Sequence, residues 1–353
     1  MIDTKKYFTT RLLRWNIADN DRPMPWKGEK DPYKIWLSEV ILQQTRVLQG
    51  WDYYNRFVNA FPTIQHLAKA PETKVFKLWE GLGYYTRCKN LIATAKFIVE
   101  THRGKFPHYY EEILRLKGVG PYTAAAIGSF AFDLPYAVVD GNVFRVLSRY
   151  FGIIKAIDST EGKKLFTRLA NELLDKKIPG IYNQALMDLG AVVCKPQLPL
   201  CTICPLKSKC IAHLKGMTGI LPVKEKTILK KKRWFYYVMA EYNGTVYVRK
   251  RSSKDIWQNL FEFILTETPA AISAKQLKDI PLVNVSSAKK DLEIKHISNI
   301  HRQQLTHQLI QGQFIHVLLK RPVQLKGYKT VTNRQLQKLP FPKFITGYLA
   351  ENR

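Results

Sequence analysis

The sequence predicts a mainly α N-terminal domain followed by a smaller α+β domain. Apolar residues recur at helical spacing through most of the first part of the chain, between turns that carry glycine and proline. After residue 233 the pattern changes to short β-branched and aromatic runs, separated by turn signals such as Tyr242-Asn243-Gly244. With 353 residues the chain is long enough for two such domains, each with its own core.

The domain limits and elements follow from these patterns. We expect the helical domain at residues 1–220, a basic linker at 221–233, and the second domain at 234–353. Helices are expected over residues 5–17, 34–50, 71–80, 86–101, 109–116, 121–131, 142–151, 161–175 and 180–194. Strands are expected over residues 234–240, 245–250, 257–265 and 313–320.

The charge of the chain indicates a polyanionic partner. Its 56 basic and 28 acidic residues give a formal net charge of +28, and nucleic acid is the commonest partner of such a protein. A membrane surface is the alternative, but no basic amphipathic anchor stands apart, and no apolar run approaches the roughly 20 residues that span a bilayer. Because the N-terminus also lacks the apolar core of a signal peptide, we expect an intracellular, cytoplasmic protein.

Glu39 lies among apolar residues of the second expected helix. On the helical period it is one turn from Ile35 and Trp36 and one turn before Leu42. A helical glutamate is usually a solvated surface residue. Apolar neighbours on both sides instead predict a desolvated carboxyl, whose raised pKa makes it a usable general acid near neutrality.

A glycine turn and a lone acid stand out between residues 116 and 147. Gly118 and Gly120 allow a tight turn with exposed backbone N–H groups in front of Pro121, and such a helix N-terminus can hold a phosphate. Further along, Asp140 begins another expected helix. Together they indicate chemistry on a nucleic-acid backbone or base, while a plain helical hairpin with Asp140 as an N-cap is an equally good interpretation.

A second glycine-aromatic turn occupies residues 79–85. Exposed aromatic side chains in a basic protein can stack on bases or wedge between them. The alternative for Tyr84 and Tyr85 is packing in the core, which is commoner for a pair of tyrosines.

The cysteines indicate a metal centre. Disulfides are the alternative, and a reducing cell disfavours them. Structural zinc usually uses two short C-x2-C-like knuckles, and only one such pair occurs here. The compact, uneven loop therefore predicts one [4Fe–4S] cluster, with a structural role in shaping a basic loop that faces phosphates. Its ligands would be Cys194, Cys201, Cys204 and Cys210, in the spacing C-x6-C-x2-C-x5-C.

These motifs together resemble the helix-hairpin-helix DNA glycosylases of the endonuclease III superfamily, and within it the MutY-type adenine DNA glycosylases. The resemblance covers residues 8–212 densely and the remainder thinly. It implies a helix-hairpin-helix glycosylase domain with a cluster loop, and a Nudix-like C-terminal domain that recognises 8-oxoguanine. The matching segments are residues 37–45, 79–85, 116–120, 139–143 and 183–190.

The resemblance implies an enzyme of base excision repair that removes adenine mispaired with 8-oxoguanine or guanine in double-stranded DNA. Such an enzyme is expected to be a monomer associated with a bacterial nucleoid. Glu39 would be the general acid, and Asp140 would stabilise the oxocarbenium ion or attack it transiently, with Tyr122 and Asn142 positioning the sugar, the water or the aspartate. The base pocket would comprise Arg22, Met24, Trp26 and Gln184. The DNA contacts would be Gln44, Thr45, Leu82, Tyr84, Gly118 and Gly120.

Two departures from related patterns refine this expectation. Endonuclease III-like lyases carry a nucleophilic lysine where this chain has Tyr122, and a phenol cannot form the Schiff base, so the enzyme should be monofunctional. Leu305, Thr306 and His307 stand where the family often has Phe-Ser-His for contact with 8-oxoguanine, and a polar hairpin with incidental histidines is the alternative. Because residues 234–353 lack the glutamate-rich helix of Nudix hydrolases, that domain should bind and not hydrolyse.

Two other functions compete with this one. A non-catalytic iron–sulfur protein that binds DNA or senses damage would leave Glu39 and Asp140 without a purpose. An endonuclease III-like pyrimidine glycosylase with lyase activity is disfavoured by Tyr122 and by the C-terminal domain.

Overall fold

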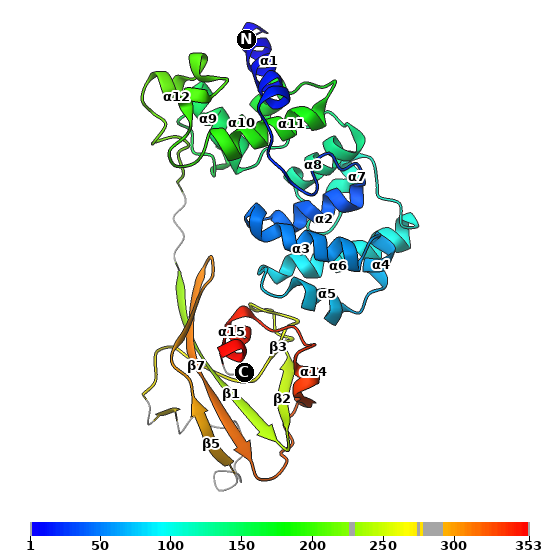
Figure 1. Cartoon of the computed structure of the whole chain (residues 1–353), viewed down its shortest axis with the longest axis vertical. Coiled ribbons are helices and arrows are strands. Elements are labelled where there is room, and N and C mark those ends of the chain that lie inside the picture. Colours follow the sequence, from blue (N-terminus) through cyan, green and yellow to red (C-terminus); the bar gives the residue numbers. More distant parts are fainter. Residues whose placement is uncertain (1, 226–229, 274–275, 278–291, 352–353) are drawn as a thin grey trace. The chain divides into compact units, whose positions relative to one another are not determined.

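The computed structural model (Figure 1) describes residues 2–225, 230–273, 276–277 and 292–351. By its contacts the chain divides into two compact units. Unit 1 comprises Met1–Lys69 with Asn90–Lys226, and unit 2 comprises Ala70–Lys89 with Thr227–Arg353. This division assigns residues 70–89 to unit 2, whereas the sequence-based limits place them in the helical domain.

Unit 1 is helical, and Figure 1 shows its helices in two groups, α1 with α9 to α12, and α2 to α4 with α6 to α8. A π-helical segment, Leu189–Val193, continues α11. No helix within the described ranges is long and apolar enough to cross a membrane. The first residues of α6, up to Lys89, belong to unit 2. The helices are α1 (Ile2–Ala18), α2 (Pro32–Leu42), α3 (Val47–Ala60), α4 (Ile64–Lys69), α6 (Tyr85–His102), α7 (Tyr110–Arg115), α8 (Pro121–Phe132), α9 (Gly141–Phe151), α10 (Thr160–Leu173), α11 (Pro179–Asp188) and α12 (Ile211–Leu214).

The predicted single helix over 34–50 is wrong, because two helices, α2 and α3, occupy this range with a non-helical segment between them. Asp31 caps α2 by accepting from the Tyr33 N–H at 2.9 Å, and Pro32 occupies the first turn, as the sequence suggests. The helix ends at Leu42, and Gln44 adopts a left-handed φ of 56°, which no helix accommodates. The spacing of apolar residues did not reveal this break.

Apolar faces of the first helix group form one core cluster of unit 1. Residues of α1 pack with residues of α9, α10 and α11, which are far apart in sequence. This packing fixes where α9 and α11 begin and end, and both helices carry predicted site residues. The cluster includes Phe8, Leu12, Val146, Leu147, Phe166, Leu173 and Leu186.

Unit 2 contains α5 (Glu72–Trp79), a mixed sheet, α14 (Asn333–Leu336) and α15 (Lys343–Glu351), which lies beside the sheet in Figure 1. Over the described residues the main strand order is β3-β2-β1-β7-β5; in addition β4 pairs with β1, β6 with β7 and β8 with β2. The long strands β1 and β7 are parallel neighbours, and the others pair antiparallel. The strands are β1 (Lys231–Tyr242), β2 (Thr245–Lys250), β3 (Phe261–Glu262), β4 (Ile264–Thr268), β5 (Leu292–Ile297), β6 (His301–Gln304), β7 (Gln308–Leu319) and β8 (Lys329–Thr332).

A mainly α domain followed by an α+β domain is thus confirmed, although β5, β6 and β8 were not expected and one strand is misplaced. β1 begins at Lys231, within the expected linker 221–233, of which residues 226–229 lie outside the described ranges. The β1–β2 turn has positive φ at Asn243 and Gly244, as an Asn-Gly hairpin requires. The strand predicted from residue 257 begins only at Phe261, because Trp257 and Asn259 also have positive φ, which interrupts an extended chain.

Candidate active site

Two carboxyl groups and a phenol from three helices meet in unit 1. Glu39 of α2 is 5% exposed, and its carboxyl is hydrogen-bonded to the hydroxyl of Tyr122, near the start of α8. Asp140, at the start of α9, lies close enough for its charge to act on both groups. The two halves of the site predicted from separate motifs therefore lie together.

The surroundings of the two carboxyl groups differ in hydrogen-bond donors. Burial raises the pKa of Glu39 to about 7, with the hydrogen bond from Tyr122 opposing this rise and the charge of Asp140 adding to it. Burial also raises the pKa of Asp140, but the Val143 N–H at 2.8 Å and Asn142 Nδ2 at 2.7 Å donate to its carboxylate and oppose that rise. Glu39 is thus suited to hold a proton near neutrality, whereas the hydrogen-bond donors around Asp140 favour its carboxylate form.

Asp140 is also the N-cap of α9, so the capping interpretation of this residue holds as well. Burial raises the pKa of Tyr122 well above its usual value, so its hydroxyl remains a donor to Glu39. A cap in a polar cluster of this kind is held rigidly, which favours a fixed carboxylate.

Arginine side chains of α9 connect this cap to the cysteine loop. Arg145 is 7% exposed and donates to Asn142 Oδ1 at 2.8 Å, to the Gly190 carbonyl at 2.7 Å and to the Cys194 carbonyl at 2.7 Å. One turn later Arg149 donates to Cys194 Sγ at 3.4 Å. The position of Asn142, and through it Asp140, is therefore tied to the loop that begins at Cys194.

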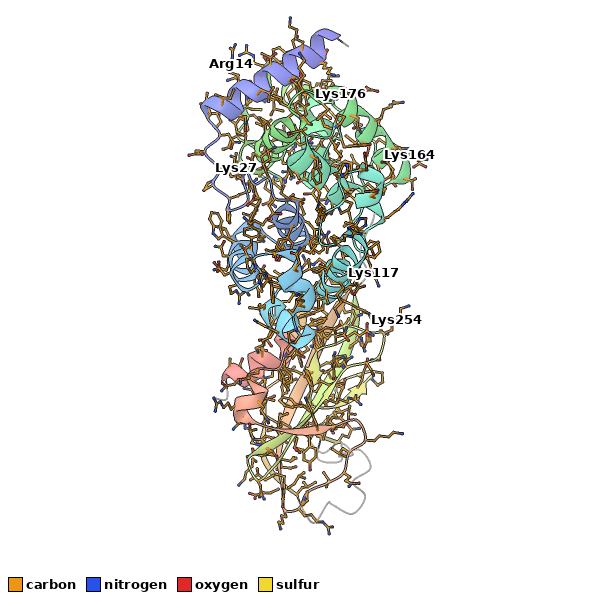
Figure 2. All side chains as sticks on the ribbon, turned by 90° about the vertical axis from the view of Figure 1, so that its right-hand side faces the viewer. Arg14, Lys27, Lys117, Lys164, Lys176 and Lys254 are labelled. Atoms are coloured by element: carbon orange, nitrogen blue, oxygen red, sulfur yellow. The ribbon has the colours of Figure 1, made fainter. Side chains whose placement is uncertain are left out.

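The glycine hairpin lies between α7 and α8. Gly118 has φ +81°, and a Cβ there would lie 2.8 Å from Asn90, so both its conformation and its packing require glycine. Gly120 is the N-cap of α8 and faces open space. Lys117 is exposed beside it, as Figure 2 shows together with other basic side chains of unit 1. An anion can therefore reach the N-terminus of α8.

A cavity of about 220 Å³ lies next to Glu39. Three predicted pocket or catalytic residues line it, namely Trp26, Gln184 and Glu39. Arg22 and Met24 do not line it; Arg22 instead pairs with the buried Asp188 at 2.7 Å. Lining residues that the sequence did not reveal include Lys27, Ser38, Phe130, Gly180 and Ile181. They come from several elements, so no single motif marks them.

The four cysteines of the loop line one small cavity with Arg149, and none is in a disulfide. Across the described residues, no group of three or more His, Cys, Asp or Glu is arranged to hold a single metal ion. The structure therefore brings the four predicted ligands to one cavity.

In unit 2 the aromatic turn lies against the tip of the β6–β7 hairpin. Tyr84 is 42% exposed with φ +48°, and its hydroxyl is hydrogen-bonded to Thr306, whereas Tyr85 and Leu82 are buried. Trp79 Nε1 donates to the Gly83 carbonyl at 2.9 Å, which holds the turn. Leu305, Thr306 and His307 form the connection between the two strands.

Comparison with known proteins places the chain in a family. Residues 37–174 match the model of the HhH-GPD superfamily of base excision DNA repair proteins. An adenine DNA glycosylase of Buchnera aphidicola subsp. Schizaphis graminum is 38% identical over 258 residues, which cover 72% of this chain and 74% of that protein. The chain belongs to the adenine DNA glycosylase family. The family membership predicted from the motifs is therefore confirmed.

Solved structures agree on the fold. A thermostable thymine-DNA glycosylase superposes with a TM-score of 0.56 at 29% identity, covering 60% of this chain and 98% of that one. An endonuclease III in a non-covalent complex with DNA gives a TM-score of 0.51 at 20% identity, covering 62% and 98%, and shows the fold alone.

Proposed function

We propose that this adenine DNA glycosylase hydrolyses the N-glycosidic bond of adenine mispaired with 8-oxoguanine or guanine in double-stranded DNA. The observation that carries the proposal is the buried Glu39 carboxyl, hydrogen-bonded to Tyr122, near Asp140 and lining the cavity. A base inside a duplex is out of reach, so the adenine must leave the stack and enter that cavity.

The two carboxyl groups divide the chemistry between them. Glu39, protonated near neutrality, donates its proton to N7 of adenine and makes the base a better leaving group. Departure of the base leaves positive charge on the sugar, which Asp140 stabilises as a carboxylate or captures transiently. Water then adds to the same sugar carbon and releases a proton, which completes the hydrolysis. This division parallels the paired carboxyl groups of glycoside hydrolases. Tyr122 and Asn142 position the carboxyl groups, and without an amine at residue 122 no Schiff base forms.

The glycine hairpin and the cysteine loop serve binding. The open N-terminus of α8 at Gly120 holds a DNA phosphate next to the sugar. The four thiols line one cavity, and their spacing, with a single C-x2-C pair, suits a [4Fe–4S] cluster better than zinc. Cys194, Cys201, Cys204 and Cys210 would hold the cluster, which would supply a covalent centre for the basic loop.

Unit 2 supplies the contact to the base opposite adenine. The hydrogen bond between Tyr84 and Thr306 supports this role, because it joins an exposed ring that can stack on bases to the loop expected to read 8-oxoguanine. Leu82 is buried, so within this turn Tyr84 is better placed for DNA. In unit 1, Gln44 is exposed on the α2–α3 break and would enter the duplex, with Thr45 beside it.

Base release from matched duplexes tests the function. The substrates are adenine opposite 8-oxoguanine, guanine or thymine, and cytosine opposite 8-oxoguanine. We expect release of adenine from the first two only, without a covalent complex after borohydride treatment. Failure to release adenine from either, or release of a pyrimidine with strand cleavage, would contradict the proposal.

A further inference from the structure

Asp188, the last residue of α11, is a buried carboxylate whose two oxygens are both occupied. Its side chain is 0% exposed. Oδ1 accepts from Gln184 Nε2 at 2.9 Å and from Arg22 Nη1 at 2.7 Å. Oδ2 accepts from Asn20 Nδ2 at 2.9 Å and lies 3.2 Å from Lys27 Nζ. No step of the mechanism above uses this group.

These contacts fix the orientation of the Gln184 amide. A carboxylate, here paired with an arginine and a lysine, offers only hydrogen-bond acceptors. The amide atom that faces it at 2.9 Å must therefore be the NH₂ group, and the carbonyl oxygen Oε1 is left for other partners. Gln184 lines the cavity next to Glu39, whereas Asp188 does not line it. Of the two polar atoms of the Gln184 amide, Oε1 is therefore the one left to accept a hydrogen bond from a base in the cavity.

We propose that Asp188 is a positioning residue that sets the base selectivity of the cavity through Gln184. With its NH₂ group held by Asp188, Gln184 presents an acceptor to an exocyclic amino group such as that at C6 of adenine. A base with a carbonyl at C6, such as hypoxanthine or guanine, meets an acceptor facing an acceptor and is rejected. This inference rests on the proposed excision of adenine.

Asp188→Asn would leave the Gln184 amide without a fixed orientation. Its amide offers a donor as well as acceptors, so Gln184 can rotate and present either its carbonyl or its NH₂ group. Arg22 and Lys27 would lose the charge that they pair with, and Lys27 also lines the cavity. The double variant described below separates an effect of these cations from that of the Gln184 amide. Selectivity therefore falls even where both bases are still released.

The test compares release of adenine and of hypoxanthine, each placed opposite 8-oxoguanine, under single-turnover conditions. Hypoxanthine keeps N7, so protonation by Glu39 is available to both bases. We expect Asp188→Asn to lower the adenine-to-hypoxanthine rate ratio at least about tenfold, the effect of reversing one hydrogen-bonded edge contact. Glu172→Gln removes an exposed carboxyl of the same unit and leaves the ratio unchanged. A misfolded fraction lowers both rates and does not move the ratio.

A second variant keeps the test decisive if Asp188→Asn does not fold. Gln184→Met removes the amide and should itself lower the ratio, and adding Asp188→Asn to it should have no further effect on the ratio. An unchanged ratio in Gln184→Met, or in a folded Asp188→Asn protein, overturns the inference. If the parent releases neither base, the proposed function has failed instead.

Discussion

Replacing Glu39 by glutamine should stabilise the protein at alkaline pH while it removes the proton donor. Burial raises the pKa of Glu39 from 4.5 to about 7, so the folded protein binds this proton more tightly than the unfolded chain does. The stability linked to that proton is complete below pH 4.5 and is lost as the pH rises through 7. The full loss is about 3 kcal/mol, because one pH unit corresponds to roughly 1.4 kcal/mol.

Urea unfolding of the parent and of Glu39→Gln at pH 5 and pH 8 measures this effect. Far-ultraviolet circular dichroism follows mainly the helical unit. Between these two pH values the glutamine variant should gain about 2–3 kcal/mol relative to the parent, since a neutral amide has no charge to bury. Glu172→Gln, at an exposed position, is the matched control and should follow the parent. If the free energy of unfolding changes equally with pH in the parent and in Glu39→Gln, the raised pKa of Glu39 is refuted.

Three further outcomes follow from the site. Asp140→Asn should change the free energy of unfolding by less than about 0.5 kcal/mol, because asparagine caps helices as well as aspartate does. The same variant should slow base release roughly 10³-fold. A rate loss explained by a matching loss of folded protein would contradict the division of roles. Tyr122→Phe removes the hydrogen bond that lowers the pKa of Glu39, so the alkaline fall of the rate–pH profile should move to higher pH, and an unmoved or lowered limb argues against the contact. Purified parent should show broad visible absorption and bound iron that Cys204→Ser diminishes, whereas a colourless zinc-loaded parent refutes the cluster.

The sequence was sufficient to predict those features of the site that depend on residues within a few positions of one another. The apolar residues around Glu39 predicted its burial, and that burial is confirmed. Its role as the general acid stays a prediction. Asp140 and the glycine hairpin were found by turn and cap chemistry, which also acts over a few residues.

The missed features depend on contacts between distant residues. Asp188 lies in a matching motif, but its partners Arg22 and Lys27 come from a loop at the other end of the unit's sequence. The local sequence signals only the contact between Gln184 and Asp188, because these two residues are one helical turn apart. The hydrogen bond between Tyr84 and Thr306 joins residues of two separate segments, and no periodicity encodes such a pair.

The most direct test of the account is the single-turnover release of adenine from a duplex with adenine opposite 8-oxoguanine, by the parent and by Glu39→Gln. The central claim is that Glu39 supplies the proton that lets the base depart. Loss of a positioned general acid should slow release at least about 10³-fold at neutral pH, with DNA binding retained. A Glu39→Gln protein that releases adenine at the rate of the parent would contradict that claim.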